Sequence, residues 1–357
     1  MSLEKNYIVK LKNAKSLYTI KNKIKSKKAK VKKHIKDIDL LVIEDADDDL
    51  IKELEADKTV EFVEVDELVA PDDFIPNDPS YANQWHLPKI QMPKAWELSK
   101  GKDVIVAVLD TGVDLAHKEF VGKIIPGINT YANNNVLTDV YGHGTKVIGV
   151  IVALTNNAQG IASVAPDAKV LAIRVSRDDG YALYSDIAEG VTYAANNKAK
   201  IASISFAGVN GSSSIKSAAQ YLKSKGGLTV TAAGNLGRLD TTPASDHLIA
   251  VSATTSTDTR PSFSSFGDYV DISAPGNNIY TTAKGNNYTS ISGTSFSAPI
   301  VAGVLALMMS ARSGLKAQVY EQVLFNSVDD LGAVGKDQYF GHGRVNAFKA
   351  VQNIINY

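Results

Sequence analysis

The amino-acid sequence predicts an α/β protein in which a small N-terminal domain precedes a doubly wound, mostly parallel sheet. Two observations carry this prediction. After residue 101, short runs that are apolar on nearly every residue alternate with segments of helical periodicity, as in a parallel sheet covered on both faces. Before residue 70 the chain has neither glycine nor proline, whereas all 26 glycines and 11 prolines come later. This change in composition marks a domain boundary.

The N-terminal segment alternates in the order strand, helix, strand, strand, helix, strand, which is the βαββαβ order of a ferredoxin-like unit. Residues 1–36 hold 13 lysines and one acid, and residues 37–73 hold 16 acids and 2 lysines. We expect these halves to face one another, and we prefer this to a nucleic-acid site because the acids follow at once. The expected elements are 6–11, 14–25, 29–34, 40–44, 48–56 and 60–65.

Residues 70–83 contain three prolines and no periodic pattern, so we expect an exposed linker that is easily cut. The predicted division is therefore a domain at 1–69, the linker at 70–83 and the main domain at 84–357. In the main domain the expected strands are 104–109, 169–175, 201–206, 229–233 and 248–253, and the expected helices are 184–196, 213–225 and 297–312.

Composition narrows the classes of function. Equal numbers of basic and acidic residues, 38 each, give no overall field that would draw the protein to nucleic acid or to an anionic membrane. The absence of cysteine excludes a thiol nucleophile and thiolate metal ligands. No run of about 18 consecutive apolar residues predicts a membrane span, and the start lacks the apolar segment of a signal peptide. We expect a monomer that uses no organic cofactor.

Three residues in the main domain occupy positions where parallel sheets gather reactive groups. Asp110 ends the first apolar run, His143 lies between two glycines before an apolar helix, and Ser295 precedes the long apolar helix. Taken singly, Asp110 and Ser295 could be helix or turn caps, and His143 could be an ordinary hydrogen-bonded histidine.

Together the three residue types favour nucleophilic catalysis. A serine needs a base to take its proton, and the base needs an acid to orient it. Asn235, at the end of another apolar run, supplies a carboxamide donor for an oxyanion, although alone it would pass as a turn residue. The order Asp, His, Ser along the chain is one of the known arrangements of this triad. The pattern predicts acyl transfer by a serine hydrolase.

These residues lie in motifs that resemble those of the subtilase family over nearly the whole chain. The motifs are DTG at 110–112, HGT at 143–145, AGN at 233–235, GTSFSAP at 293–299 and GHGRVNA at 341–347. The resemblance implies a subtilisin-like fold and a serine endopeptidase acting on polypeptides. It also implies that the N-terminal domain is an inhibitory propeptide and folding helper, so that the chain is made as a zymogen.

The resemblance further implies binding sites and a location. Substrate would pair with Ser205, Phe206, Ala207 and Gly208, and would lie beside Ala233 and Gly234. A structural Ca²⁺ would be held by the side chains of Asp78, Glu119 and Asn157 and by the carbonyls of Thr155, Gln159 and Ile161. The family usually has glycine at position 207, aspartate at position 119, and histidine or a small residue where this chain has Lys146. Secretion is the implied location, with the signal peptide absent from this sequence, and the cytoplasm is the alternative.

Two other functions stay open at this point. An aspartic protease could use the DTG motif, but it would need a second such motif, which the sequence lacks. A protein permanently bound by its N-terminal domain could act as a non-catalytic binding module. The substrate also stays open between broad scavenging and the processing of one precursor, such as a leader-bearing peptide. Asp240 and Asp246 flank the expected wall of the S1 pocket, which favours a basic residue at P1.

Overall fold

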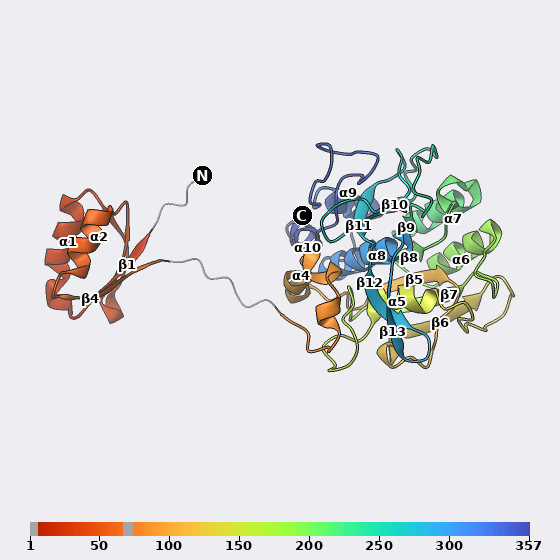
Figure 1. The fold of residues 1–357 in the computed structure, drawn as a ribbon, viewed down its shortest axis with the longest axis horizontal. Coiled ribbons are helices and arrows are strands. Elements are labelled where there is room, and N and C mark those ends of the chain that lie inside the picture. The colour runs from red at the N-terminus through yellow and green to blue at the C-terminus, as the bar shows by residue number, and fades with distance from the viewer. Residues whose placement is uncertain (1–5, 67–73) are drawn as a thin grey trace. The chain divides into compact units, whose positions relative to one another are not determined.

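The computed structural model describes residues 6–66 and 74–357 of the chain. They form two compact units, Met1–Asp72 and Asp73–Tyr357 (Figure 1).

The first unit is a four-stranded antiparallel sheet covered by two helices. Its strands lie in the order β2-β3-β1-β4. Apolar residues of both helices and of the strands form one core, which includes Val9, Ile24 and Leu50. The elements are β1 (Tyr7–Leu11), α1 (Leu17–Ser26), β2 (Lys30–Ile35), β3 (Leu40–Glu44), α2 (Asp48–Glu55) and β4 (Val60–Val65), which is the element order that periodicity predicts.

Ion pairs hold the two oppositely charged halves of this unit together. Each pair found among its described residues joins a lysine of the first half to an acid of the second, as the charge pattern predicts. The pairs are Lys23–Asp57, Lys27–Glu53, Lys30–Asp45, Lys32–Glu44 and Lys10–Glu61.

The second unit is built on a seven-stranded sheet in which all neighbouring strands are parallel. The order is β11-β10-β9-β8-β5-β7-β6, so the direction of winding reverses at β5. In sheets of this kind, ligands bind at such a point, outside the carboxyl ends of the strands. The strands are β5 (Ile105–Asp110), β6 (Ile124–Asn129), β7 (Lys169–Arg174), β8 (Ile201–Ile204), β9 (Leu228–Ala232), β10 (Ile249–Thr254) and β11 (Ile272–Pro275).

Helices cover both faces of this sheet (Figure 1). In β5, Val106 and Val108 pack into a core shared with α5 and α8, whereas Ala107 and Leu109 pack against α6 and α7. This alternation explains why β5 is apolar on every residue before Asp110. The helices are α3 (His86–Lys89), α4 (Met92–Leu98), α5 (Gly144–Val152), α6 (Tyr184–Asn196), α7 (Ser213–Ser224), α8 (Thr294–Ala311), α9 (Ala317–Phe325) and α10 (Ala347–Ile355).

A hairpin of β12 (Ile279–Ala283) and β13 (Asn287–Ile291) lies against α5 and leads directly into α8. The hydroxyls of Thr281 and Thr282 donate to the carbonyls of Lys146 and Thr145, at 2.8 and 2.7 Å. The hairpin therefore connects the start of α5 to the start of α8.

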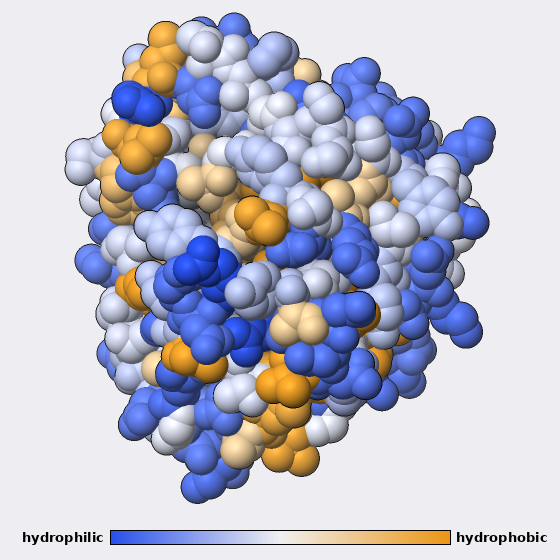
Figure 2. All heavy atoms as spheres, turned by 90° about the vertical axis from the view of Figure 1, so that its right-hand side faces the viewer, coloured by the Kyte–Doolittle hydropathy of each residue, from blue (hydrophilic) through white to orange (hydrophobic). Residues whose placement is uncertain are grey.

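The five strands and three helices predicted for this unit are present, and α8 differs at its start. It begins at Thr294, three residues earlier than predicted, so Ser295 lies within its first turn. Within the described part of the chain, α8 is the one helix long and apolar enough to cross a membrane, but 89% of it is buried inside the protein. On the face drawn in Figure 2, apolar side chains form small groups among polar ones.

Candidate active site

Asp110 and His143 are joined by a hydrogen bond at the carboxyl edge of the sheet. Asp110 is the last residue of β5 and is buried, and His143 is the N-cap of α5. The distance from His143 Nδ1 to Asp110 Oδ1 is 2.7 Å, and the backbone N–H of Thr111 donates to the same oxygen at 2.8 Å. Asp110 Oδ2 is buried without a hydrogen-bond partner. This carboxylate is therefore poorly solvated and faces an imidazole that can carry positive charge.

Two opposing effects set the pKa of His143. Burial of the ring lowers the pKa of His143, but the charge and hydrogen bond of Asp110 together outweigh burial and raise it above 6.5. Lys146 lowers this pKa and Asp139 raises it. The ring keeps 21% of its surface exposed, so a reacting group can reach it.

The segments that carry Asp110 and His143 touch through their glycines. A Cβ atom on Gly144 would lie 2.2 Å from the carbonyl oxygen of Gly112, which no side chain can tolerate. Gly112 itself has a φ of +116°, a conformation that other residues rarely adopt. Gly144 is thus required by the close approach of the two segments, and Gly112 by its φ and by the carbonyl of Leu137, which would lie 2.4 Å from its Cβ.

The hydroxyl of Ser295 bonds to the end of β8, and the residue that follows Ser295 packs against His143. Ser295 Oγ donates to the carbonyl of Ser205 at 3.2 Å, and Ser205 Oγ donates to the carbonyl of Ser295 at 3.0 Å. The ring of Phe296, the next residue, lies 5.6 Å from the ring of His143. In the described part of the chain no hydrogen bond joins the side chains of Ser295 and His143, and the contact between the two segments is made by Phe296.

Asn235 approaches the start of α8 and is oriented by Thr294. Asn235 Oδ1 accepts hydrogen bonds from both the backbone N–H and the hydroxyl of Thr294, each at 2.9 Å. The carboxamide oxygen is therefore occupied, and Nδ2 is left as the free donor group. Gly234 is fixed by the same residue, because its N–H donates to Thr294 Oγ1 at 3.1 Å. Ala233 is buried, and its carbonyl accepts from the hydroxyl of Tyr269 at 2.7 Å.

The four residues predicted to pair with substrate follow directly after β8. Ser205 is buried, Phe206 is half-buried, and Ala207 and Gly208 are exposed. The carbonyl of Gly208 accepts from the hydroxyl of Tyr184 at 3.1 Å. This segment therefore begins at Ser205, which contacts Ser295, and ends at the surface.

The residues predicted to hold a cation meet at the loop before Ile161. Asp78 accepts from the N–H groups of Asn156 and Asn157 at 2.7 and 3.2 Å. Glu119 accepts from the N–H of Ile161 at 3.3 Å and from the side chain of Asn157 at 3.4 Å. The N–H of Gln159 donates to Asn157 Oδ1 at 2.9 Å, and Thr155 lies on the same loop.

The two carboxylates at this loop are buried and have no cationic partner among the described residues. Burial raises the pKa of both Asp78 and Glu119, and their mutual repulsion contributes to the shift of Glu119. The sequence did not point to Tyr288, whose hydroxyl donates to Glu119 Oε1 at 2.7 Å. No group of three or more acidic or histidine side chains suited to a metal occurs in the parts of the chain described. Any cation here must take the remaining ligands from amide and carbonyl oxygens, which suits Ca²⁺.

Sequence reasoning missed Thr294 and Asp139. Thr294 orients Asn235, and the buried carboxylate of Asp139 binds the segments on either side of His143. The spacing of four residues between Asp139 and His143 was visible in the sequence, but aspartate is common in turns and the spacing alone carries little information.

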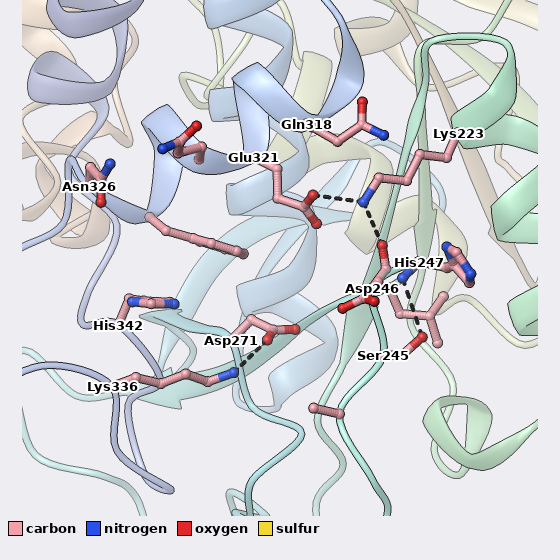
Figure 3. A pocket seen from close by; sticks show the side chains of 14 residues that line it. Lys223, Ser245, Asp246, His247, Asp271, Gln318, Glu321, Asn326, Lys336 and His342 are labelled. Carbon is pink, nitrogen blue, oxygen red and sulfur yellow. Dashed lines mark hydrogen bonds and ion pairs between the residues drawn. The ribbon is translucent and has the colours of Figure 1, made fainter.

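A cleft lies at the amino ends of β10 and β11 (Figure 3), and neither Asp110 nor Asn235 lines it. It has a volume of about 670 Å³, and two ion pairs line it: Lys223 with Glu321 at 2.7 Å, and Lys336 with Asp271 at 2.9 Å. Asp246 lines this cleft. Asp246 therefore lies at the wrong end of the strands to wall an S1 pocket beside Asn235. The carboxylate of Asp240 accepts from the N–H and hydroxyl of Thr242.

Comparison with known proteins identifies the family of the chain. Residues 101–343 match the Subtilase family. Thermitase from Thermoactinomyces vulgaris is 40% identical over 282 residues, which are 78% of this chain and 100% of thermitase. Subtilisin NAT from Bacillus subtilis subsp. natto is 31% identical over 366 residues, with 98% of this chain and 91% of that protein covered.

A solved structure supports the same assignment. It belongs to the proteases from Pseudoalteromonas arctica and superposes with a TM-score of 0.70 at 28% identity, covering 79% of this chain and 100% of that one. The family match covers more than half of the chain, and it includes the segments that carry Asp110, His143, Asn235 and Ser295. The chain therefore belongs to the subtilase family and is a subtilisin-like serine endopeptidase.

Proposed function

We propose that this endopeptidase cleaves peptide bonds through a triad of Asp110, His143 and Ser295. Ser295 Oγ attacks the scissile carbonyl while His143 takes its proton, and Asp110 orients His143 and stabilises the imidazolium. The carboxamide of Asn235 and the N–H of Ser295 stabilise the tetrahedral oxyanion. His143 then returns the proton to the leaving amine, and water hydrolyses the acyl-enzyme.

The observation that carries this proposal is the 2.7 Å hydrogen bond between buried Asp110 and His143, together with the packing of Phe296, the residue after Ser295, against the ring of His143. In the structure the hydroxyl of Ser295 bonds to the carbonyl of Ser205. A rotation about Cα–Cβ between staggered rotamers redirects it toward His143, and catalytic hydrogen bonds often tighten only when substrate binds. Because the chain belongs to the subtilase family, it is neither an aspartic protease nor a non-catalytic binding protein, the two other functions that the sequence left open.

The test is Ser295→Ala, with Ser292→Ala as its matched control. Ser292 lies on the same segment, but its hydroxyl is exposed and bonds to Asn277. We expect Ser295→Ala to lower kcat by about 10⁶-fold and to abolish labelling by a fluorophosphonate, and we expect Ser292→Ala to keep both. Turnover by Ser295→Ala within tenfold of the parent would contradict the assignment.

We also propose that the chain is a zymogen with a propeptide at 1–69, a processing linker at 70–83 and a catalytic domain at 84–357. Two observations support this: the first unit folds as a separate βαββαβ domain, and the similarity to subtilisin NAT extends over 98% of this chain. We expect the active full-length chain to cut itself between residues 70 and 83, and Ser295→Ala to stay intact. N-terminal sequencing of the mature form measures the cut, and a cut outside this range would contradict the boundaries.

Substrate residues on the acyl side are proposed to pair with Ser205–Gly208 as an added strand, close to Ala233 and Gly234. Support comes from the exposure of Ala207 and Gly208 and from the contact of Ser205 with Ser295. The methyl group of Ala207 leaves less room for the substrate beside this segment than a glycine would. We expect Ala207→Gly to lower KM for peptides with a bulky P1 residue, measured with a P1 library, and an unchanged P1 profile would contradict it. The same library decides between a broad substrate range and the processing of one precursor.

A structural Ca²⁺ is the proposed ion at Asp78, Glu119 and Asn157, with carbonyls of Thr155, Gln159 and Ile161 as further ligands. Two buried carboxylates without a cation are costly, and an ion would remove that cost. At about 100 times its dissociation constant, Ca²⁺ would stabilise the fold by about 2.7 kcal/mol, which raises the melting temperature by roughly 5 to 10 °C. We expect this shift in calorimetry for the parent, with Mg²⁺ as the control ion, and its loss in Glu119→Gln. Equal melting temperatures in Ca²⁺ and in a chelator would contradict the site.

We propose an extracellular location, in keeping with a bacterial subtilase that cleaves its own propeptide. Fractionation of the source culture, followed by activity labelling, tests this. Labelled enzyme confined to the cytoplasm would overturn it.

A further inference from the structure

Asp139 is a buried carboxylate to which the proposed mechanism gives no role. It is 2% exposed, and no lysine or arginine pairs with it among the described residues. Its Oδ1 accepts from Thr111 Oγ1 at 2.7 Å and from the N–H of Gly142 at 2.6 Å. Its Oδ2 accepts from the N–H and the hydroxyl of Thr145 at 2.8 and 2.6 Å. Both oxygens are thus fully used by short hydrogen bonds.

The donors to Asp139 flank the two residues of the proposed catalytic pair. Thr111 follows Asp110 directly, and Gly142 and Thr145 lie on either side of His143. Thr111 Oγ1 also accepts from the N–H of Gly144 at 2.8 Å. One carboxylate therefore ties the end of β5 to the segment that opens α5.

Only an ionised carboxylate satisfies this set of donors. An asparagine would keep one acceptor oxygen and would turn its own N–H groups toward either Gly142 or Thr145, which leaves two donors facing each other. A buried carboxylate without a cation is costly unless hydrogen bonds compensate, and here four of them do.

We propose that Asp139 is a positioning residue for the reaction: by holding the backbone on both sides of His143 against Thr111, it sets the distance and angle between Asp110 and His143. This inference rests on the catalytic roles proposed above for Asp110 and His143. This role of Asp139 explains how the hydrogen bond between Asp110 and His143 is held to within a few tenths of an ångström, although β5 and α5 belong to different layers of the fold.

Charged groups from three elements surround His143. Asp110 faces it from β5, and Lys146 lies on α5 with its Nζ donating to the carbonyl of Gly142 at 2.8 Å. Lys284, in the turn of the β12–β13 hairpin, donates to the carbonyl of Val140. Asp139 adds a negative charge on the side of the loop, so its removal should also lower the pKa of His143.

The decisive variant is Asp139→Asn, assayed on a peptide substrate over a range of pH. We expect kcat to fall by about 10²-fold with KM within about threefold of the parent, because a misplaced base affects the chemical step more than binding. We also expect the acidic limb of kcat/KM against pH to move to lower pH. Loss of the charge alone would move this limb and leave kcat on the pH plateau unchanged, so the fall in plateau kcat is the readout that reports positioning.

Thr111→Val is the second variant, because it removes the hydroxyl that joins Asp139 to Gly144 and keeps the carboxylate. It should lower kcat by about tenfold and leave the acidic limb in place. The matched control is Asp271→Asn, which removes another buried, hydrogen-bonded carboxylate at the far end of the strands. We expect it to lower the melting temperature and to keep the kcat and pH profile of the parent.

The outcomes separate this inference from the proposed function. If Ser295→Ala is inactive and Asp139→Asn keeps the kcat and pH profile of the parent, the positioning role is overturned and the triad stands. If Asp139→Asn does not fold, Thr111→Val decides, and a kcat equal to that of the parent overturns the proposal. Activity in Ser295→Ala would instead remove the proposed mechanism itself.

Discussion

Asn235 illustrates how hydrogen bonds can fix the orientation of a single side chain, here one proposed to stabilise the oxyanion. Thr294 holds Asn235 Oδ1 with two hydrogen bonds, so Nδ2 is fixed as the outward donor before substrate binds. A preoriented donor stabilises an oxyanion without further reorganisation.

We expect Asn235→Ala to lower kcat by about 10²- to 10³-fold with little change in KM, since the donor acts on the transition state. Leu236→Ala is the control, because Leu236 is the exposed neighbour on the same segment. Steady-state kinetics on one peptide ester and one peptide amide measure both. A fall in kcat of less than about threefold for Asn235→Ala would mean that the oxyanion lies elsewhere.

The pKa of His143 predicts the pH dependence of the reaction. His143 must be neutral to accept the proton of Ser295, and its pKa is raised above 6.5 by Asp110 in the free enzyme. We therefore expect kcat/KM to rise with pH through an apparent pKa above 6.5. Asp110→Asn should move this pKa down and lower kcat by about 10⁴-fold. An acidic limb that stays in place in Asp110→Asn would show that another group titrates.

For individual residues, the sequence predicts which residue types the site needs better than it predicts which atoms those residues contact. A buried aspartate at a strand end must have a donor, and the partner that Asp110 needs is His143. In contrast, the bond from Ser295 to Ser205 depends on a side-chain rotamer, and the network of Asp139 depends on a backbone approach between distant segments. The position of Asp246 relative to Asn235 could not be predicted either, because it depends on the path of a loop.

Among the elements, the β12–β13 hairpin and α5 are in unusually close contact. A Cβ atom on Gly149 would lie 2.0 Å from the hydroxyl oxygen of Thr282 and 2.9 Å from that of Thr281. Alanine normally favours a helix over glycine, but here it would push away the hairpin that leads to Ser295.

We expect Gly149→Ala to lower the free energy of unfolding by about 1 to 3 kcal/mol despite its better helix propensity. Ser217→Ala, on the exposed side of α7, should change it by no more than about 0.5 kcal/mol. Denaturant unfolding of both variants in the Ser295→Ala background measures this. A more stable Gly149→Ala would mean that the hairpin does not pack on α5 in solution.

The predictability of elements follows their burial. β5, β7, β8, β9 and β10 are sandwiched between helices, so their apolar runs are long enough to recognise. β6 contains Pro126 and Gly127, β11 has only four residues, and β13 is largely polar, so none has a clear pattern. α8 begins earlier than its apolar run because threonine and serine occupy its first turn, where sequence alone suggests a cap.

Across the whole second unit, a network around Arg344 ties the C-terminal segment to distant parts of the chain. Arg344 is buried and binds both Asp258 and Asp329. Lys89 of α3 also pairs with Asp258 at 2.8 Å, and Lys349 of α10 pairs with Asp329 at 2.7 Å. Burial opposes ionisation of the two aspartates, but these basic partners outweigh it and lower the pKa of both Asp258 and Asp329.

We expect Arg344→Met to lower the free energy of unfolding by about 1.5 to 3 kcal/mol at neutral pH. Because the folded-state pKa values of both aspartates lie below 3.8, their stabilisation is present above that pH and is lost as the pH falls through the folded values. The difference between Arg344→Met and the parent should therefore shrink as the pH falls below 3.8. Lys349→Met, which removes an exposed partner, should cost less than about 1 kcal/mol. A difference that does not depend on pH would contradict the ionic origin.

The parallel sheet has a consequence for the lifetime of the enzyme. Val106 of the central strand pairs with Val170 on one side and Ile201 on the other, so its neighbours must be found across long stretches of chain. Such non-local pairing makes folding slow. Where active molecules cleave an unfolded molecule faster than it refolds, its loss is governed by the rate of unfolding. The amount of active enzyme that persists then depends on the rate of unfolding and not on the equilibrium free energy of unfolding.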